Sequence, residues 1–284
     1  MNYFTFADVE FWQVFGKTLP SSKYIPDNRD VYLIKLKLRS SECIFGSFEH
    51  FKIDNMNWLT QALSSTLGKK LIMALTGLFL ILFLVGHLLG NLQLFKDDGG
   101  QAFNEYAKFM TTNPIVKILS YITYISVIIH VINSIRLTLA NRKARPVDYA
   151  VKSRSQNSDW SSRNMGILGT LILIFLVIHM RSFWYEMHFG QMPMVEYEGG
   201  EQIKDLYAVV VVAFKELWYV LLYVACMAAL GFHLVHGFQS AFQTLGLSHP
   251  KYTPFIKIAG FSFAIIVPIL FATMPVFLYL KDFN

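Results

Sequence analysis

The chain is poor in charged residues and in cysteine, and each shortage argues against a class of protein. Only 15% of the 284 residues are Asp, Glu, Lys or Arg, whereas 54% are hydrophobic, which is too apolar for an ordinary soluble domain. The two cysteines, Cys43 and Cys226, are far apart and form no CxxC or CxxCH motif, so neither a thiolate metal site nor covalent attachment of a cofactor is indicated.

The hydrophobic residues are gathered in long blocks, each near the roughly 20 residues that cross a bilayer as a helix. Five spans are expected, at residues 71–95, 115–140, 165–180 (extended through "RSFWYEMHF"), 206–245 and 258–280. Lys215 and Glu216 lie near the start of the fourth block, so its membrane core is expected at 217–238. Pro268 and Pro275 are expected to kink the fifth helix. The predicted fold class is an all-α membrane protein with five transmembrane helices.

The charges of the loops predict how the chain is oriented in the bilayer. The loop between the second and third spans is basic, with Arg142, Lys143, Arg145, Lys152, Arg154 and Arg163. The loop between the third and fourth spans is mostly acidic, and Lys69 and Lys70 precede the first span. Cationic loops stay on the cytoplasmic side, so a cytoplasmic amino end and an external carboxyl end are expected. The net charge of +6 is read as this topology signal, and no nucleic-acid partner is expected.

Residues 1–55 follow a different pattern from the rest. They lack the basic start, short apolar core and cleavage site of a signal peptide, and they show no sustained helical period. They are interpreted either as a soluble extension or as sequence upstream of a true start at Met56. Residues 56–284 then form the membrane domain.

Histidines lie deep inside four of the five expected spans. They are His87, His130, His179 and, in the fourth span, His233 with His236. Ionisable groups are costly inside a membrane, so each needs an explanation. A neutral imidazole bonded to a neighbouring helix would explain any one of them alone. A proton relay would call for Asp or Glu among them, and the cores of these spans hold no carboxylate. A zinc or copper site would need the imidazoles at one depth.

The depths of these histidines, estimated at 1.5 Å per residue, fall on two levels. His87 and His179 both lie about 25 Å from the cytoplasmic charges, and His130 lies about 18 Å from them. If the fourth helix ends near Gly246, His236 lies about 15 Å and His233 about 20 Å from the same side of the membrane. Depth therefore does not decide which of these two histidines is on the level of His130. Two levels of two imidazoles in a four-helix core are what two stacked bis-histidine haems b need.

Glycines near these positions would let a porphyrin approach the backbone. They are Gly77, Gly86, Gly90 and Gly237. For any single one of them, ordinary helix packing explains a small residue equally well.

Four stretches carry a resemblance to a known family. The runs "GHLLGNLQLF", "HVINSIRLTLANRKARPVDY", "IHMRSFWY" and "HGFQSAFQTLG", in this order, resemble the five-helix dihaem cytochrome b membrane subunit of bacterial succinate:quinone oxidoreductases, which include succinate dehydrogenases and fumarate reductases. The resemblance covers residues 56–284. It implies that the first four helices form a haem-binding bundle, with His87, His130, His179 and His236 as the axial ligands of two haems b. His236 is chosen because the family ligand stands in a His-Gly pair, and His233 would then bond a propionate, a water or a helix.

The resemblance also implies the partners. Succinate chemistry would occur at FAD in a soluble flavoprotein, and an iron-sulfur subunit would pass electrons to this chain, which would exchange them with membrane menaquinone in the bacterial cytoplasmic membrane. No catalytic residue is expected in this chain. Arg136 and Arg181 are candidates to neutralise haem propionates. Leu234 stands where some dihaem fumarate reductases carry a glutamate, which favours the succinate-oxidising direction.

Two other interpretations stay open. The chain would fit the cytochrome b of a different respiratory complex, such as a hydrogenase or a formate dehydrogenase. From another class, it would fit a non-haem polytopic transporter whose histidines bind substrate or protons.

Overall fold

The computed structural model describes residues 57–144, 159–198 and 200–281. The predictions for residues 1–55, for a start at Met56 and for Arg145, Lys152 and Arg154 therefore lie outside the described residues. The chain divides into two units, Met1–Trp58 and Leu59–Asn284, and the long helices all belong to the second.

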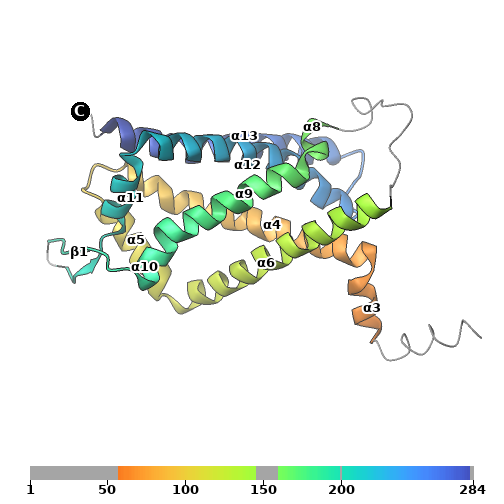
Figure 1. Cartoon of the computed structure of the whole chain (residues 1–284), viewed down its shortest axis with the longest axis horizontal. Helices are drawn as coiled ribbons and strands as arrows, with labels where there is room; N and C mark the ends of the chain where they lie inside the picture. The colour runs from red at the N-terminus through yellow and green to blue at the C-terminus, as the bar shows by residue number, and fades with distance from the viewer. Residues whose placement is uncertain (1–56, 145–158, 199, 282–284) are drawn as a thin grey trace, which may run out of the picture. The chain divides into compact units, whose positions relative to one another are not determined.

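Five long helices dominate this unit (Figure 1). They are α4 (Thr66–Asn91, continued by the short 3-10 turn Leu92–Phe95), α6 (Pro114–Lys143), α9 (Met165–His179), α12 (Leu217–Thr244) and α13 (Thr253–Lys281). α9 runs on through a π-helical segment, Met180–Tyr185, into α10 (Glu186–Phe189). All five are long and apolar enough to cross a membrane, which indicates a multi-pass membrane protein. The expected all-α class with five spans is confirmed at this level.

The helix ends follow from local side chains. Ser65 caps α4 by accepting a hydrogen bond from the Gly68 amide at 3.0 Å. Asn113 caps α6 by accepting from the Ile115 amide at 2.9 Å, and Pro114 occupies the first helical position, where no amide hydrogen is needed. At its other end α6 carries Arg142 and Lys143, which suit the negative end of a helix dipole.

The expected fourth block, 206–245, is two helices rather than one. α11 (Leu206–Phe214) ends before Lys215, and α12 begins at Leu217, the residue expected to open the membrane core. Between them the backbone of Glu216 is extended, with φ −85° and ψ 109°. Two charged residues at a helix junction explain the break, because each is better solvated outside the apolar layer.

Short elements connect the spans. α3 (Trp58–Ser64) leads into α4, and α8 (Trp160–Arg163) leads into α9. α5 (Gln101–Thr112) lies between the first two spans, where no helix was predicted from the sequence. A two-stranded antiparallel hairpin, β1 (Met194–Val195) with β2 (Ile203–Lys204), lies between α10 and α11.

One buried amide joins three of these elements. The Asn104 side chain on α5 is 1% exposed and donates to the Tyr197 hydroxyl at 2.9 Å and to Asp205 Oδ1 at 2.8 Å. Its oxygen accepts from the Tyr207 amide at 2.9 Å. α5, the hairpin segment and the start of α11 are therefore fastened together, and we call this group of elements the outer cap.

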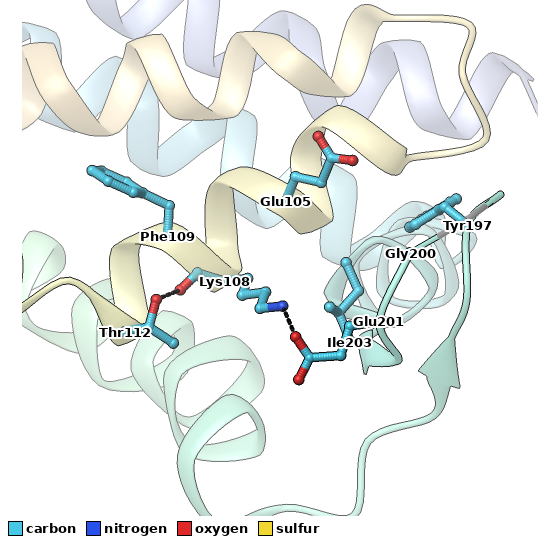
Figure 2. Close-up of a pocket in the computed structure, with 8 residues that line it drawn as sticks. All are labelled: Glu105, Lys108, Phe109, Thr112, Tyr197, Gly200, Glu201 and Ile203. Carbon is cyan, nitrogen blue, oxygen red and sulfur yellow. Dashed lines mark hydrogen bonds and ion pairs between the residues drawn. The ribbon is translucent and has the colours of Figure 1, made fainter.

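The outer cap borders an open hollow of about 300 Å³, and Figure 2 shows the residues that line it. Lys108 of α5 reaches across it to Glu201 of the hairpin loop, with 2.7 Å between Nζ and Oε2. The ammonium of Lys108 lowers the pKa of the Glu201 carboxyl. Both side chains are open to solvent, so this ion pair adds little to stability. None of the histidines singled out from the sequence lines the hollow.

Among the described helices, α12 and α13 share the most extensive contact. A Cβ at Gly231 of α12 would lie 3.0 Å from the Ala264 carbonyl oxygen of α13, so glycine is what lets the two backbones approach there. Pro268 and Pro275 are both buried inside α13. α12 also packs on α4 and α9, and α6 packs chiefly on α4.

Candidate functional site

The histidines of α4 and α9 meet inside the bundle. The ring centroids of His87 and His179 are 5.7 Å apart, and the two rings are perpendicular. Phe83, Phe271 and Phe183 surround them, at 5.4 to 5.6 Å between ring centroids. Helices that are separate in sequence thus bring two imidazoles together in an aromatic environment, and we call them the outer pair.

A second pair joins α6 and α12. The ring of His130 lies 6.4 Å from that of His233, at an angle of 61°. His236 follows three residues later on α12, and within the described part of the chain no aromatic ring is paired with its imidazole. The choice of His236 as the ligand stays a prediction, but the geometry favours His233. We call His130 and His233 the inner pair.

The orientation of His130 is held by a hydroxyl. Thr76 Oγ1 lies 3.1 Å from His130 Nδ1 and itself donates to the Ile72 carbonyl at 2.8 Å. The hydroxyl proton is therefore used, and Thr76 accepts from an Nδ1–H of the imidazole. This bond selects the tautomer whose Nε2 keeps a free lone pair, the form that a metal ligand requires.

His179 has a similar partner and the other two histidines do not. Tyr223 Oη lies 3.2 Å from His179 Nδ1. Asn91 Nδ2 is 3.5 Å from His87 Nδ1, at the limit of a hydrogen bond, while it donates to the His87 carbonyl at 2.7 Å. Among the described residues, His233 Nδ1 is a buried side-chain nitrogen without a hydrogen-bond partner. Each pair therefore contains one imidazole with a hydrogen bond to a hydroxyl and one imidazole without such a bond.

The four glycines named from the sequence have different surroundings. A Cβ at Gly77 would contact His130 Cε1 at 3.4 Å. Gly86 and Gly237 have no atom within 4 Å of an added Cβ, so the backbone is open there. Gly90 is different, because a side chain there would collide with the ring of Tyr106. Gly90 is thus a packing glycine for α5.

The two arginines named from the sequence differ as well. Arg181 forms an ion pair with Glu186 and lies over the ring of Tyr185, at 4.5 Å from the guanidinium carbon to the centroid. Arg136 is exposed on α6, between His130 and the end of the helix that carries Arg142 and Lys143. Their role at propionates stays a prediction.

The spacing of both pairs can be compared with that of a bis-imidazole metal site. Two metal–nitrogen bonds of about 2.0–2.1 Å, with about 1.1 Å from each nitrogen to its ring centre, separate two ring centroids by roughly 6.3 Å. The 6.4 Å of the inner pair agrees with this value, and the 5.7 Å of the outer pair is about 0.6 Å shorter. Apart from these pairs, the described ranges contain no group of three or more His, Cys, Asp or Glu suited to a metal ion. A haem iron takes only two protein ligands, so each pair offers the number of imidazoles that one such group would need.

Sequence reasoning missed the hydroxyls around the histidines. Thr76, Ser182, Tyr219 and Tyr223 are polar residues within apolar helices, which is a signal in itself because a polar group buried in a membrane needs a partner. The partners lie 37 to 54 residues away, on other helices. Sequence spacing alone could not pair them.

Comparisons of the chain with protein-family models, with curated proteins and with solved structures found no match. The features that bear on function are the five helices able to cross a membrane and the two imidazole pairs between them.

Proposed function

We propose that the chain is the cytochrome b membrane anchor of a succinate:quinone oxidoreductase, with two non-covalent haems b. His87 and His179 would hold one haem, and His130 and His233 the other. The observation that carries the proposal is the occurrence of two imidazole pairs, each from two helices, near the spacing of a bis-imidazole site. The motifs that resemble the dihaem subunits supply the choice of complex.

The chain's own residues would bind each haem, orient the imidazole ligands and shield them from water. Thr76 orients His130 of the inner pair, and Tyr223 orients His179 of the outer pair. Phe83, Phe183 and Phe271 keep water from the outer pair. Each haem, when bound, supplies one-electron transfer across part of the membrane. Succinate oxidation would take place at the FAD of a partner flavoprotein, and an iron-sulfur subunit would deliver the electrons.

The two ends of the bundle differ in charge, and this difference supports a direction of electron flow. His130 lies toward the end of α6 that carries Arg142 and Lys143, the end expected to be cytoplasmic, so the inner pair would face the iron-sulfur subunit. The outer pair would exchange electrons with menaquinone. The residue two before His233 is Gly231, so with either histidine of α12 as ligand the glutamate of some fumarate reductases is missing. This supports a succinate-oxidising enzyme.

The test is a spectrum followed by an assay. The full chain, purified from membranes with whatever subunits accompany it, is expected to give a reduced-minus-oxidised spectrum of haem b and two haems per chain. A flavoprotein and an iron-sulfur protein should co-purify, and the complex should reduce a menaquinone analogue with succinate. A colourless preparation would overturn the proposal in favour of a transporter. Two haems with a different partner would place the chain in another respiratory complex.

A further inference from the structure

A row of hydroxyls leads away from His179. Tyr223 Oη lies 3.2 Å from His179 Nδ1 and 3.1 Å from Tyr219 Oη. Tyr219 in turn donates to Ser182 Oγ at 2.8 Å. Tyr219 and Tyr223 are 6% and 7% exposed, so these bonds are made away from solvent. Four polar groups from two helices thus form one row of hydrogen bonds, and its two tyrosines are buried.

All the hydrogen bonds in this row are donated in the same direction, from His179 toward Ser182. The proton of Tyr219 is used toward Ser182, so Tyr223 donates to Tyr219 and accepts from His179 Nδ1–H. A hydroxyl that donates becomes a better acceptor, so each bond strengthens the one before it. The result is a proton held on Nδ1 of His179 and a free lone pair on Nε2.

A π-helical segment makes the far end of the row possible. It begins at Met180, directly after His179, and contains Ser182. Single π turns inside helices widen the spacing of side chains and are frequent at functional sites. Here the wider turn coincides with Ser182 meeting Tyr219 on α12. The same segment carries Trp184, whose Nε1 donates to the Tyr124 hydroxyl at 2.7 Å.

From this geometry we propose that Tyr223, supported by Tyr219 and Ser182, is a positioning residue that sets the electron-donating strength of His179. The inference rests on the proposed function. A partner that accepts the Nδ1 proton of a ligating imidazole raises the basicity of the ligand, which favours the oxidised iron. Tyr223 therefore holds the midpoint potential of the outer haem below the value it would have without this bond.

The test is a redox titration of the whole complex carrying Tyr223→Phe. The variant removes one oxygen and keeps the ring, so two haems are expected to remain. The midpoint potential of the outer haem should rise. At a fixed potential its ratio of reduced to oxidised iron should increase about threefold to tenfold, which for a one-electron couple is about 28 to 59 mV. The inner haem should keep its potential.

Two further variants complete the design. Tyr219→Phe does not touch the imidazole and should raise the same potential by a smaller amount, so it decides the matter if Tyr223→Phe loses haem. Tyr124→Phe is the matched control, since it removes a hydroxyl that binds Trp184 and contacts neither pair, and it should cause no shift.

The possible results separate the two proposals. An unmodified protein without haem overturns the proposed function. Two haems with the outer potential unshifted, lowered, or shifted equally by Tyr124→Phe overturn only the role of Tyr223.

Discussion

His233 and His236 are three positions apart on α12, which turns them about 60° from each other around the helix. That rotation is enough to give them different neighbours. The ring of His233 lies 6.4 Å from His130, and its Nδ1 is buried with no hydrogen-bond partner among the described residues. This nitrogen has been desolvated without a compensating hydrogen bond, and in the proposed cytochrome the bond from Nε2 to iron would have to outweigh that cost.

Replacing His233 should therefore have a different effect from replacing His236. His233→Ala is expected to lose the inner haem, halving the haem content and stopping succinate-driven quinone reduction, while succinate oxidation with a soluble acceptor persists. His236→Ala should keep both haems, with at most a changed potential. Haem content and reduced-minus-oxidised spectra of the two purified variants measure the contrast. The reverse pattern would restore His236 as the ligand.

Asn104 offers a second single-residue test, outside the membrane core. Asn104→Ala removes three hydrogen bonds and leaves the Tyr207 amide without its acceptor, so it should destabilise the outer cap by about 2–3 kcal/mol. The matched control is Gln101→Ala on the same helix, whose amide bonds only to exposed Glu105. Thermal unfolding in detergent is the measurement. Equal effects of the two changes would show that the buried network is not what fastens α5.

Long apolar helices are the elements that a sequence predicts best, and the short ones between them are the hardest. The five spans follow from composition, because a run of roughly 20 apolar residues matches the thickness of the hydrocarbon core when it forms a helix. α5 was missed because its 12 residues are only partly apolar, and Asn104, the residue that anchors it, bonds to groups about 100 positions away. The break at Glu216 was only partly anticipated. Lys215 and Glu216 signalled an edge of the membrane, not the end of a helix.

The pairing of α12 with α13 depends on one close approach. Gly231→Ala would place a Cβ 3.0 Å from the Ala264 carbonyl oxygen, so the backbone of α13 would have to move by a few tenths of an ångström, and a loss of about 1–3 kcal/mol is expected. Gly166→Ala on α9 is the control, because nothing lies within 4 Å of its added Cβ. Thermal aggregation temperatures of the two variants provide the comparison. Equal temperatures would mean that α13 can shift to make room.

The candidate site was predictable in part for a physical reason. Helix rise is constant, so counting residues from the charged ends placed His87 and His179 at one depth, and their rings do lie together. Counting cannot supply the rotation of one helix against another. His233 and His236 differ mainly in rotation, and the hydroxyls of Thr76 and Tyr223 meet the histidines only after α4, α6, α9 and α12 have packed.

The orientation of the whole chain can be tested directly. With its basic loop inside, the end of α6 should be cytoplasmic and the hairpin external. In a background without Cys43 and Cys226, Glu198→Cys should react with a membrane-impermeant thiol reagent in intact cells or spheroplasts. Arg142→Cys should react only after lysis. Labelling of Arg142→Cys in intact cells, with Glu198→Cys protected, would invert the orientation and with it the inner and outer pairs.

Protein covers the five helices very unevenly. In the most apolar stretch of α12 and of α13, 33% of residues are buried against other protein, while the figure is 11% for α4 and only 6% for α6 and α9. α12 and α13 can therefore hold each other, whereas α6 and α9 depend on lipid and, in the proposed cytochrome, on porphyrin faces. The supply of haem would then determine the half-life of the chain in the cell. In cells starved of haem, α6 and α9 should be the first helices to dissociate from the bundle and the first to be cut by membrane proteases. Newly made chain would then be degraded before it binds its soluble partners.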